Sequence, residues 1–92
     1  MADDDAFELP IDGTLDLHTF SPEDVKDLVP EYIDECRRRG ILVIRVIHGK
    51  GTGTLKGIVH EVLKKNPGVE SFEDADPMSG GWGATIVRLR PL

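Results

Sequence analysis

A glycine-rich segment between an apolar run and an amphipathic run organises the middle of this chain. Residues 48–54 read His-Gly-Lys-Gly-Thr-Gly-Thr, so glycine returns at every second position. The preceding run, Ile41 to Ile47, is β-branched and almost wholly apolar, as in a parallel strand flanked by other strands. Residues 55–65 carry apolar side chains at helical spacing. This order predicts a strand that enters a helix through a loop whose backbone N–H groups, with the helix dipole, can hold a phosphate.

The rest of the chain predicts a second helix and three further strands. Ser21 and Pro22 are typical of a helix start, with a serine cap followed by proline at the first helical position. The apolar stripe of this helix consists of Val25, Leu28, Val29, Tyr32, Ile33 and Cys36, and Gly40 ends it. Because Pro30 removes a backbone hydrogen bond, we expect a kink there or two short helices. Strands are expected over residues 14–18, 69–75 and 84–90.

The element order β-α-β-α-β-β predicts an α/β fold. If both helices cover one face of the sheet, the other face is open, and the carboxyl ends of the parallel strands share one edge. Ligands bind at that edge in open α/β sheets, and here it would gather residues 18–20, 48–54 and 76–83. The open face would carry Asp16, His18, Val43, Arg45, Arg88 and Arg90.

Composition and charge limit the functional classes. Residues 1–12 are acidic and are expected to form a flexible leader, followed by one domain over residues 13–92. The net charge of −6 argues against non-specific DNA binding driven by the overall field. However, 11 of the 17 acids lie in the leader and the first helix, which leaves the glycine loop in a neutral-to-basic neighbourhood. Without a span of ~20 apolar residues, and with the single cysteine Cys36, a reduced, cytoplasmic setting is expected.

Two histidines near the shared edge are candidates for acid–base chemistry. Asp16 and His18 are two residues apart in a strand and therefore share a face, where the carboxylate can fix the imidazole tautomer and raise its pKa. A polar strand end in contact with solvent is the alternative. His48 could act as a general acid or phosphate donor, or it could bond the loop backbone and fix its shape. His60 lies off the apolar stripe of the helix expected over residues 55–65, so its side chain is expected to be in solvent.

The glycine loop and its neighbours are candidates for binding nucleic acid. Phosphate contacts are expected from Gly49, Lys50, Gly51, Thr52 and Gly53, with the lysine neutralising charge that develops at a scissile bond. The spacing of glycine and lysine matches neither a P-loop nor the Gly-x-Gly-x-x-Gly motif, so a mononucleotide or dinucleotide cofactor is not expected. Trp82 could stack on an unpaired base, an interaction worth ~1–3 kcal/mol, or fold over the core. Arg88 and Arg90 could follow a nucleic-acid backbone or simply be solvated.

A metal site from Asp16, His18 and His48 is a further option, with Mg²⁺ the commonest nuclease metal. The chain has no second carboxylate paired at this edge apart from Asp74 or Asp76, and a two-metal nuclease would need more acids. We therefore expect metal-independent or weakly metal-assisted chemistry and assign no metal ligands.

Three sequence blocks together resemble the Smr (small MutS-related) domain family, in its stand-alone bacterial type. They are Leu15-Asp16-Leu17-His18, His48 to Gly53, and Gly81 to Thr85 with Val87 and Leu89. The resemblance runs from about Gly13 to Leu92 and implies a two-layer α/β sandwich similar to the C-terminal domain of translation initiation factor three. It also implies a mixed sheet in strand order 1-2-4-3, with the last strand antiparallel to the others.

The resemblance also implies function. Several Smr domains nick or cleave DNA or RNA and others only bind, and the residues implicated correspond here to Asp16, His18, His48, Gly49, Lys50 and Gly51. Thr19 stands where the family commonly has glycine, which narrows the approach to the loop. The first hypothesis is a phosphodiester endonuclease. The alternatives are a non-catalytic module that binds nucleic acid, the ribosome or a basic protein, and a binder of a small phosphorylated metabolite.

Overall fold

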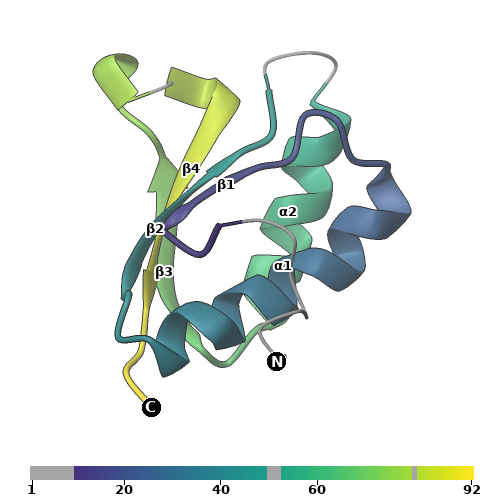
Figure 1. Cartoon of the computed structure of the whole chain (residues 1–92). Helices are drawn as coiled ribbons and strands as arrows, with labels where there is room; N and C mark the ends of the chain where they lie inside the picture. The colour runs from purple at the N-terminus through teal and green to yellow at the C-terminus, as the bar shows by residue number, and fades with distance from the viewer. Residues whose placement is uncertain (1–9, 50–52, 80) are drawn as a thin grey trace.

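The chain folds into a four-stranded sheet with two helices packed on one of its faces (Figure 1). The computed structural model describes residues 10–49, 53–79 and 81–92. The elements in chain order are β1 (Thr14–Asp16), α1 (Pro22–Arg38), β2 (Val43–Ile47), α2 (Thr54–Lys65), β3 (Val69–Asp74) and β4 (Ala84–Leu89). Two short 3-10 turns, η2 (Pro77–Ser79) and η3 (Gly81–Gly83), lie between β3 and β4. The predicted order of strands and helices is confirmed.

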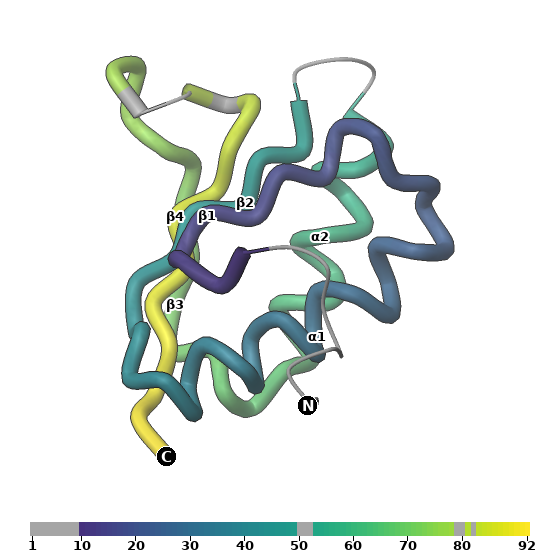
Figure 2. The backbone as a smooth tube through the Cα atoms, in the orientation of Figure 1, coloured from purple at the N-terminus to yellow at the C-terminus, as the bar shows by residue number. Residues whose placement is uncertain are grey.

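The sheet has the order β1-β2-β4-β3, as the family resemblance implied. β1 pairs with β2 in parallel, and β4 is antiparallel to both of its neighbours, β2 and β3. The ends of β1, β2 and β3 and the start of β4 therefore lie at one edge, which is at the top of Figure 1. The C-terminus lies at the opposite end of the sheet (Figure 2).

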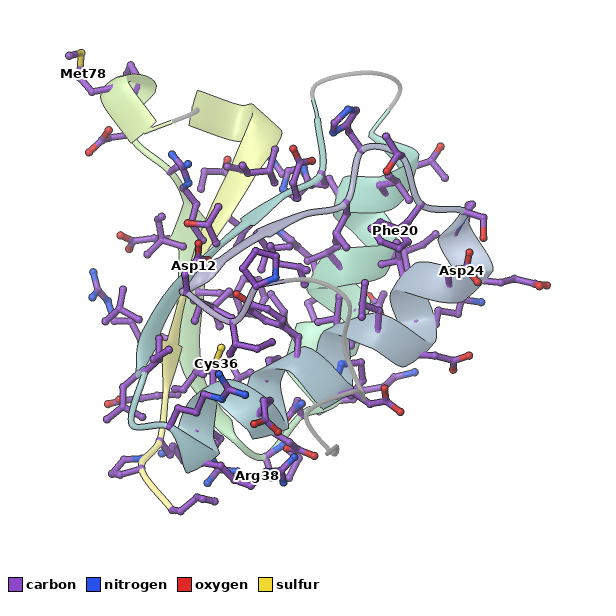
Figure 3. All side chains as sticks on the ribbon, in the orientation of Figure 1. Asp12, Phe20, Asp24, Cys36, Arg38 and Met78 are labelled. Atoms are coloured by element: carbon purple, nitrogen blue, oxygen red, sulfur yellow. The ribbon has the colours of Figure 1, made fainter. Side chains whose placement is uncertain are left out.

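The core forms between the sheet and the helices because alternate strand residues face the helical layer. Leu15 and Leu17, Ile44 and Val46, and Val87 and Leu89 are all almost fully buried. They meet the apolar stripes of the two helices, whose buried members are Val25, Val29, Tyr32, Ile33, Cys36, Val59 and Leu63. Cys36 lies between α1 and the sheet (Figure 3). Each fully buried aliphatic side chain contributes about 1.5–3 kcal/mol, so this layer dominates stability.

Helix α1 runs through Pro30 without a break, so the alternative of two short helices was wrong. Ser21 caps the helix by accepting a hydrogen bond from the Asp24 N–H. A proline inside a helix costs about 3 kcal/mol, but buried residues stand on both sides of it, at Val29 and at Tyr32 and Ile33. Packing of these side chains on the sheet outweighs the lost hydrogen bond.

The predicted leader, residues 1–12, lies mostly outside the described residues. Within the described part, Ile11 packs against the core and Asp12 accepts a hydrogen bond from the Thr14 N–H. In the same described ranges, neither helix has the length and apolar character needed to cross a membrane.

A buried hydroxyl joins α1 to the start of β1. The Gly13 N–H donates to the Tyr32 Oη at 3.1 Å, and Gly13 itself has a positive φ of 96°. Burial raises the pKa of the Tyr32 phenol to about 12, so it stays neutral.

We expect Tyr32→Phe to lower the free energy of unfolding by about 1–3 kcal/mol, because the buried Gly13 N–H would lose its acceptor. Urea denaturation measures the change. The control is Val43→Thr, a nearly isosteric change at a side chain that is 55% exposed, where about 0.5 kcal/mol or less is expected. Equal stability of Tyr32→Phe and the parent protein would show that this hydrogen bond is replaceable.

Candidate nucleic-acid site

Backbone hydrogen bonds join three distant segments at the top edge of the sheet. The Leu17 N–H donates to the Ile47 carbonyl at 2.8 Å, which ties the end of β1 to the end of β2. The N–H groups of His48 and Gly49 both donate to the Gly83 carbonyl, at 3.1 and 2.9 Å. The loop that follows β2 and the turn that precedes β4 are therefore held together. The predicted convergence of these segments is confirmed at the level of the backbone (Figure 1).

Asp16 and His18 form a close pair on the exposed side of this edge. The Asp16 Oδ1 lies 2.5 Å from the His18 Nδ1, and it also accepts the His18 backbone N–H at 3.1 Å. The side chains are 49% and 64% exposed, respectively. Hydrogen bonding to His18 holds the pKa of the Asp16 carboxyl below its usual value. The carboxylate thus fixes the ring orientation, which a general base requires.

His48 lies at the same edge but on the opposite face of the sheet. Ile44 and Val46 face the helices, and by strand alternation the His48 side chain follows them to that side. Leu15 of β1 and Leu17 just after this strand are buried toward the helices, so the Asp16–His18 pair points the other way. The sheet therefore divides the three predicted catalytic side chains between its two faces.

The buried environment of His48 matches the second of its two predicted roles. The side chain is only 5% exposed, with Nδ1 3.2 Å from the Gly49 carbonyl and Nε2 2.8 Å from the Thr85 Oγ1. Burial lowers the pKa of the imidazole. A neutral histidine with both ring nitrogens engaged by the protein is suited to shape the loop that follows it.

His60 is not in solvent, so that expectation was wrong. Its Nε2 lies 3.0 Å from the same Thr85 Oγ1, and its ring packs edge-on against Phe72 with 4.8 Å between centroids. Burial, reinforced by the neighbouring His48, lowers the pKa of His60. The sequence does contain the signal, because His60 falls at helical spacing with Lys56 and Leu63, on the side of α2 that faces the sheet. Thr85 was likewise missed as a member of the site.

The start of α2 presents a helix terminus with no side-chain cap. Gly53 is the N-cap in a left-handed conformation, with a φ of 85°, and the first turn carries no acidic residue. This leaves the terminus suited to an anion. Lys56 adds a cation in the same turn and forms a 3.0 Å ion pair with Asp74 of β3.

Part of the predicted phosphate loop differs from expectation or lies outside the described residues. The Gly49 N–H, which we expected to face a phosphate, donates to the Gly83 carbonyl instead. The positive φ of Gly49, 82°, shows why glycine is needed at this turn. Lys50, Gly51 and Thr52 lie outside the described residues, as does the side chain of Trp82, whose backbone belongs to η3.

The two arginines predicted to follow a nucleic-acid backbone lie toward the other end of the sheet. Arg88 is near the end of β4 and lies 3.8 Å from a Glu73 carboxylate oxygen on the open face. The Arg90 Nε donates to the Pro67 carbonyl at 3.2 Å. Because a strand rises about 3.4 Å per residue, Arg90 is about 20 Å from the edge that holds Ala84.

The residues weighed for a metal do not form a metal site. Asp16 and His18 contact each other on the exposed face, whereas His48 is on the buried face with both ring nitrogens engaged. In the described ranges, no group of three or more histidine, cysteine or acidic side chains has the arrangement that a metal ion requires.

Comparison with known proteins agrees with this architecture. Residues 15–90 match the family model of the Smr domain. Endonuclease MutS2 of Thermus thermophilus is 46% identical over 63 residues, which cover 68% of this chain and 8% of that protein. Endonuclease MutS2 of Thermomicrobium roseum is 39% identical over 79 residues, covering 86% of this chain and 10% of that protein.

Two crystal structures are similar over most of the chain. The Smr domain of Thermus thermophilus MutS2 has a TM-score of 0.83 at 39% identity, covering 87% of this chain and 100% of that domain. YdaL, a stand-alone small MutS-related protein from Escherichia coli, has a TM-score of 0.81 at 26% identity, covering 94% of this chain and 70% of that one.

The fold is a two-layer α/β domain in which the segments after β1 and β2 meet the turn before β4 at one edge of a mixed sheet. The chain belongs to the Smr domain family. This family is related to nucleases, since its members include the Smr domain of MutS2, a protein named as an endonuclease. It spans only 8–10% of the length of the two MutS2 proteins compared here.

The Asp16–His18 pair predicts a measurable shift in titration. In a ¹³C NMR titration the Asp16 carboxyl should titrate below 3.8, because its charged form accepts two hydrogen bonds from His18. His18→Ala should raise this pKa, whereas Thr19→Ala should leave it unchanged. An Asp16 pKa that is the same in the parent protein and in His18→Ala would contradict the pairing.

Buried His48 and partly buried His60 predict that stability falls in mild acid. Their pKa values are lowered below 6.5 in the fold, so the unfolded chain takes up protons first as the pH falls. Between pH 7 and pH 5.5 the free energy of unfolding should decrease. Lys56 adds to this effect and Asp74 opposes it. The contribution from Asp16 is lost only below 3.8 and is separate.

Urea denaturation at several pH values tests this in a His18→Ala background, which removes the exposed histidine. His60→Gln should make the pH dependence shallower, because one of the two histidines with a lowered pKa is gone. Stability that rises as the pH falls through this window would contradict the burial of neutral histidines.

Proposed function

We propose that this chain is a nucleic-acid-processing domain that cleaves phosphodiester bonds, with Asp16 and His18 as its acid–base pair. The 2.5 Å contact between the Asp16 carboxylate and the His18 Nδ1 carries this proposal. Since Asp16 accepts the Nδ1–H, Nε2 is the basic nitrogen of a neutral ring and can take a proton from a nucleophile. Similarity to proteins named endonuclease MutS2 supports the reaction class.

In this mechanism the nucleophile depends on the substrate. On RNA, the neighbouring 2′-OH gives its proton to His18 and attacks phosphorus. The bond to the 5′-oxygen breaks, and this oxygen takes a proton from solvent, which leaves a 2′,3′-cyclic phosphate and a 5′-hydroxyl. On DNA, water takes the place of the hydroxyl. Asp16 stabilises the imidazolium that forms, because its carboxylate remains bonded to Nδ1.

The phosphate is proposed to lie between His18 and the glycine loop. Lys50, Gly51 and Thr52 would contact its oxygens, and the start of α2 after Gly53 would add the partial positive charge of the helix. His48 and Gly49 would give the loop its shape. Trp82 is proposed to stack on an adjacent base, whereas Arg88 and Arg90 could meet only a longer nucleic acid.

A non-catalytic binding module is the second candidate, and the placement of His48 favours it. A cleavage mechanism commonly uses both a general base and a general acid, and His48 is buried on the other face of the sheet. Exposed acidic residues also lie along α1, namely Glu23, Asp24, Asp27, Glu31 and Asp34. They would suit a basic partner such as a ribosomal protein. Both candidates would act in the cytoplasm, where nucleic acid and reduced thiols occur together.

A cleavage assay separates the two candidates. Labelled single-stranded RNA and nicked or branched DNA are incubated with the purified protein, with and without EDTA. If cleavage occurs, His18→Ala and Asp16→Asn should reduce it, the former by about 10²–10⁴-fold, because the general base is lost or misaligned. Binding measured by fluorescence anisotropy should change much less. Asp34→Asn, on the exposed face of α1, is the matched control and should retain full activity.

Two outcomes would count against the endonuclease. Cleavage that is unchanged in His18→Ala would remove this residue from the mechanism. Binding without cleavage on every substrate, with or without added Mg²⁺, would favour the module.

A further inference from the structure

A buried hydroxyl links the residue that begins the glycine loop to the helix that follows the loop. The loop begins at His48 and ends at Gly53, the N-cap of α2, and His60 lies on α2 itself. The Oγ1 of Thr85, a residue with no exposed surface, lies 2.8 Å from the His48 Nε2 and 3.0 Å from the His60 Nε2. The two imidazole rings are edge to face, with 6.2 Å between centroids. One side chain of β4 therefore contacts groups on both sides of the loop.

The chemistry of the partners fixes the direction of these hydrogen bonds. The Gly49 carbonyl can only accept, so the His48 Nδ1 must carry a proton to bond it. In a neutral ring the His48 Nε2 is then an acceptor, and the Thr85 hydroxyl donates its single proton there. With that proton committed, the Thr85 oxygen can only accept from His60, whose Nε2 must carry a hydrogen.

We propose that His60 is a positioning residue, which acts through Thr85 to hold His48 in the Nδ1-protonated form that binds the Gly49 carbonyl. The order of donation is His60 Nε2–H to Thr85, Thr85 O–H to His48, and His48 Nδ1–H to Gly49. The lowered pKa values of both histidines are consistent with neutral rings. The tautomers of the two histidines are independent of the proposed function. The further step, that this order of donation shapes a phosphate-binding loop, rests on the proposed function.

His60 is held firmly enough for this role. Its ring packs against Phe72 of β3, and one turn earlier Lys56 pairs with Asp74 at the end of the same strand. Both contacts fix the first half of α2 against the sheet. The position of His60 is therefore set by β3, that of Thr85 by β4 and that of His48 by β2.

Two-dimensional ¹H–¹⁵N NMR of the imidazoles tests the proposal directly. At neutral pH we expect the Nδ1–H tautomer for His48 and the Nε2–H tautomer for His60. Thr85→Ser should retain both tautomers because it keeps the hydroxyl, and Thr85→Val should abolish the preference at His48. His60→Gln keeps a side-chain N–H donor and should preserve the His48 tautomer, whereas His60→Leu should not. The opposite tautomer at His48 in the parent protein, or unchanged spectra in Thr85→Val, would overturn the proposal.

Binding measurements then separate this proposal from the nuclease assignment. Inorganic phosphate and a labelled single-stranded RNA are titrated while the amide signals of Gly49 and Gly53 are followed. His60→Leu should bind roughly fivefold to tenfold more weakly, as expected for loss of one hydrogen bond in the loop, and His60→Gln should recover most of the affinity. If the parent protein binds neither ligand, the nuclease assignment fails while the tautomers still support the positioning role. Equal binding by His60→Leu and the parent protein would overturn the effect on the loop.

Discussion

Burial of alternate side chains along the two central strands, β2 and β4, decides on which face of the sheet His48 and Thr85 lie. Ile44 and Val46 on one strand, and Val87 and Leu89 on the other, must face the helices to form the core. The same alternation brings His48 and Thr85 to the buried side, where they contact each other. The alternation of β1, continued beyond its end at Asp16, sends the Asp16 and His18 side chains to the exposed side. A slip of one residue in any of these strands would exchange the faces and remove the site.

This division gives the two parts of the site different physical properties. The Asp16–His18 pair is exposed, so substrate can reach it, and its charge pairing is screened by solvent. In the neutral His48–Thr85–His60 group, His48 and Thr85 are buried and His60 is partly buried, so its hydrogen bonds are directional and costly to break. The exposed pair is suited to chemistry, and the buried group is suited to hold a loop in one shape. In a small Smr domain, the sheet provides both environments at one edge.

Much of the fold could be predicted because each element has a strong local signal. The serine cap and the proline that begins α1, the apolar run of β2 and the helical spacing of apolar residues in α2 predicted the element order. Where the signals competed, packing decided. Pro30 predicted a kink or two short helices, and the second alternative was wrong because Val29, Tyr32 and Ile33 are buried around it and the helix continues. The prediction that β4 is antiparallel to its neighbours came from the family resemblance, because the periodicity of apolar residues does not indicate the direction of a strand.

The sequence by itself determined which residues are near the functional edge: the alternation around Asp16 and His18, and the glycines after a buried strand, are local patterns. Only the tertiary structure decided which of these residues contact each other. His60 lies twelve residues after His48 in the sequence, and Thr85 lies twenty-five residues after His60. These three side chains meet because α2 packs on β4. Gly49 gave its N–H to Gly83, a partner thirty-four residues away, which no local pattern could indicate. The physical reason is that helical and strand periods fix the face of a side chain, whereas long-range packing and hydrogen bonding fix its partner.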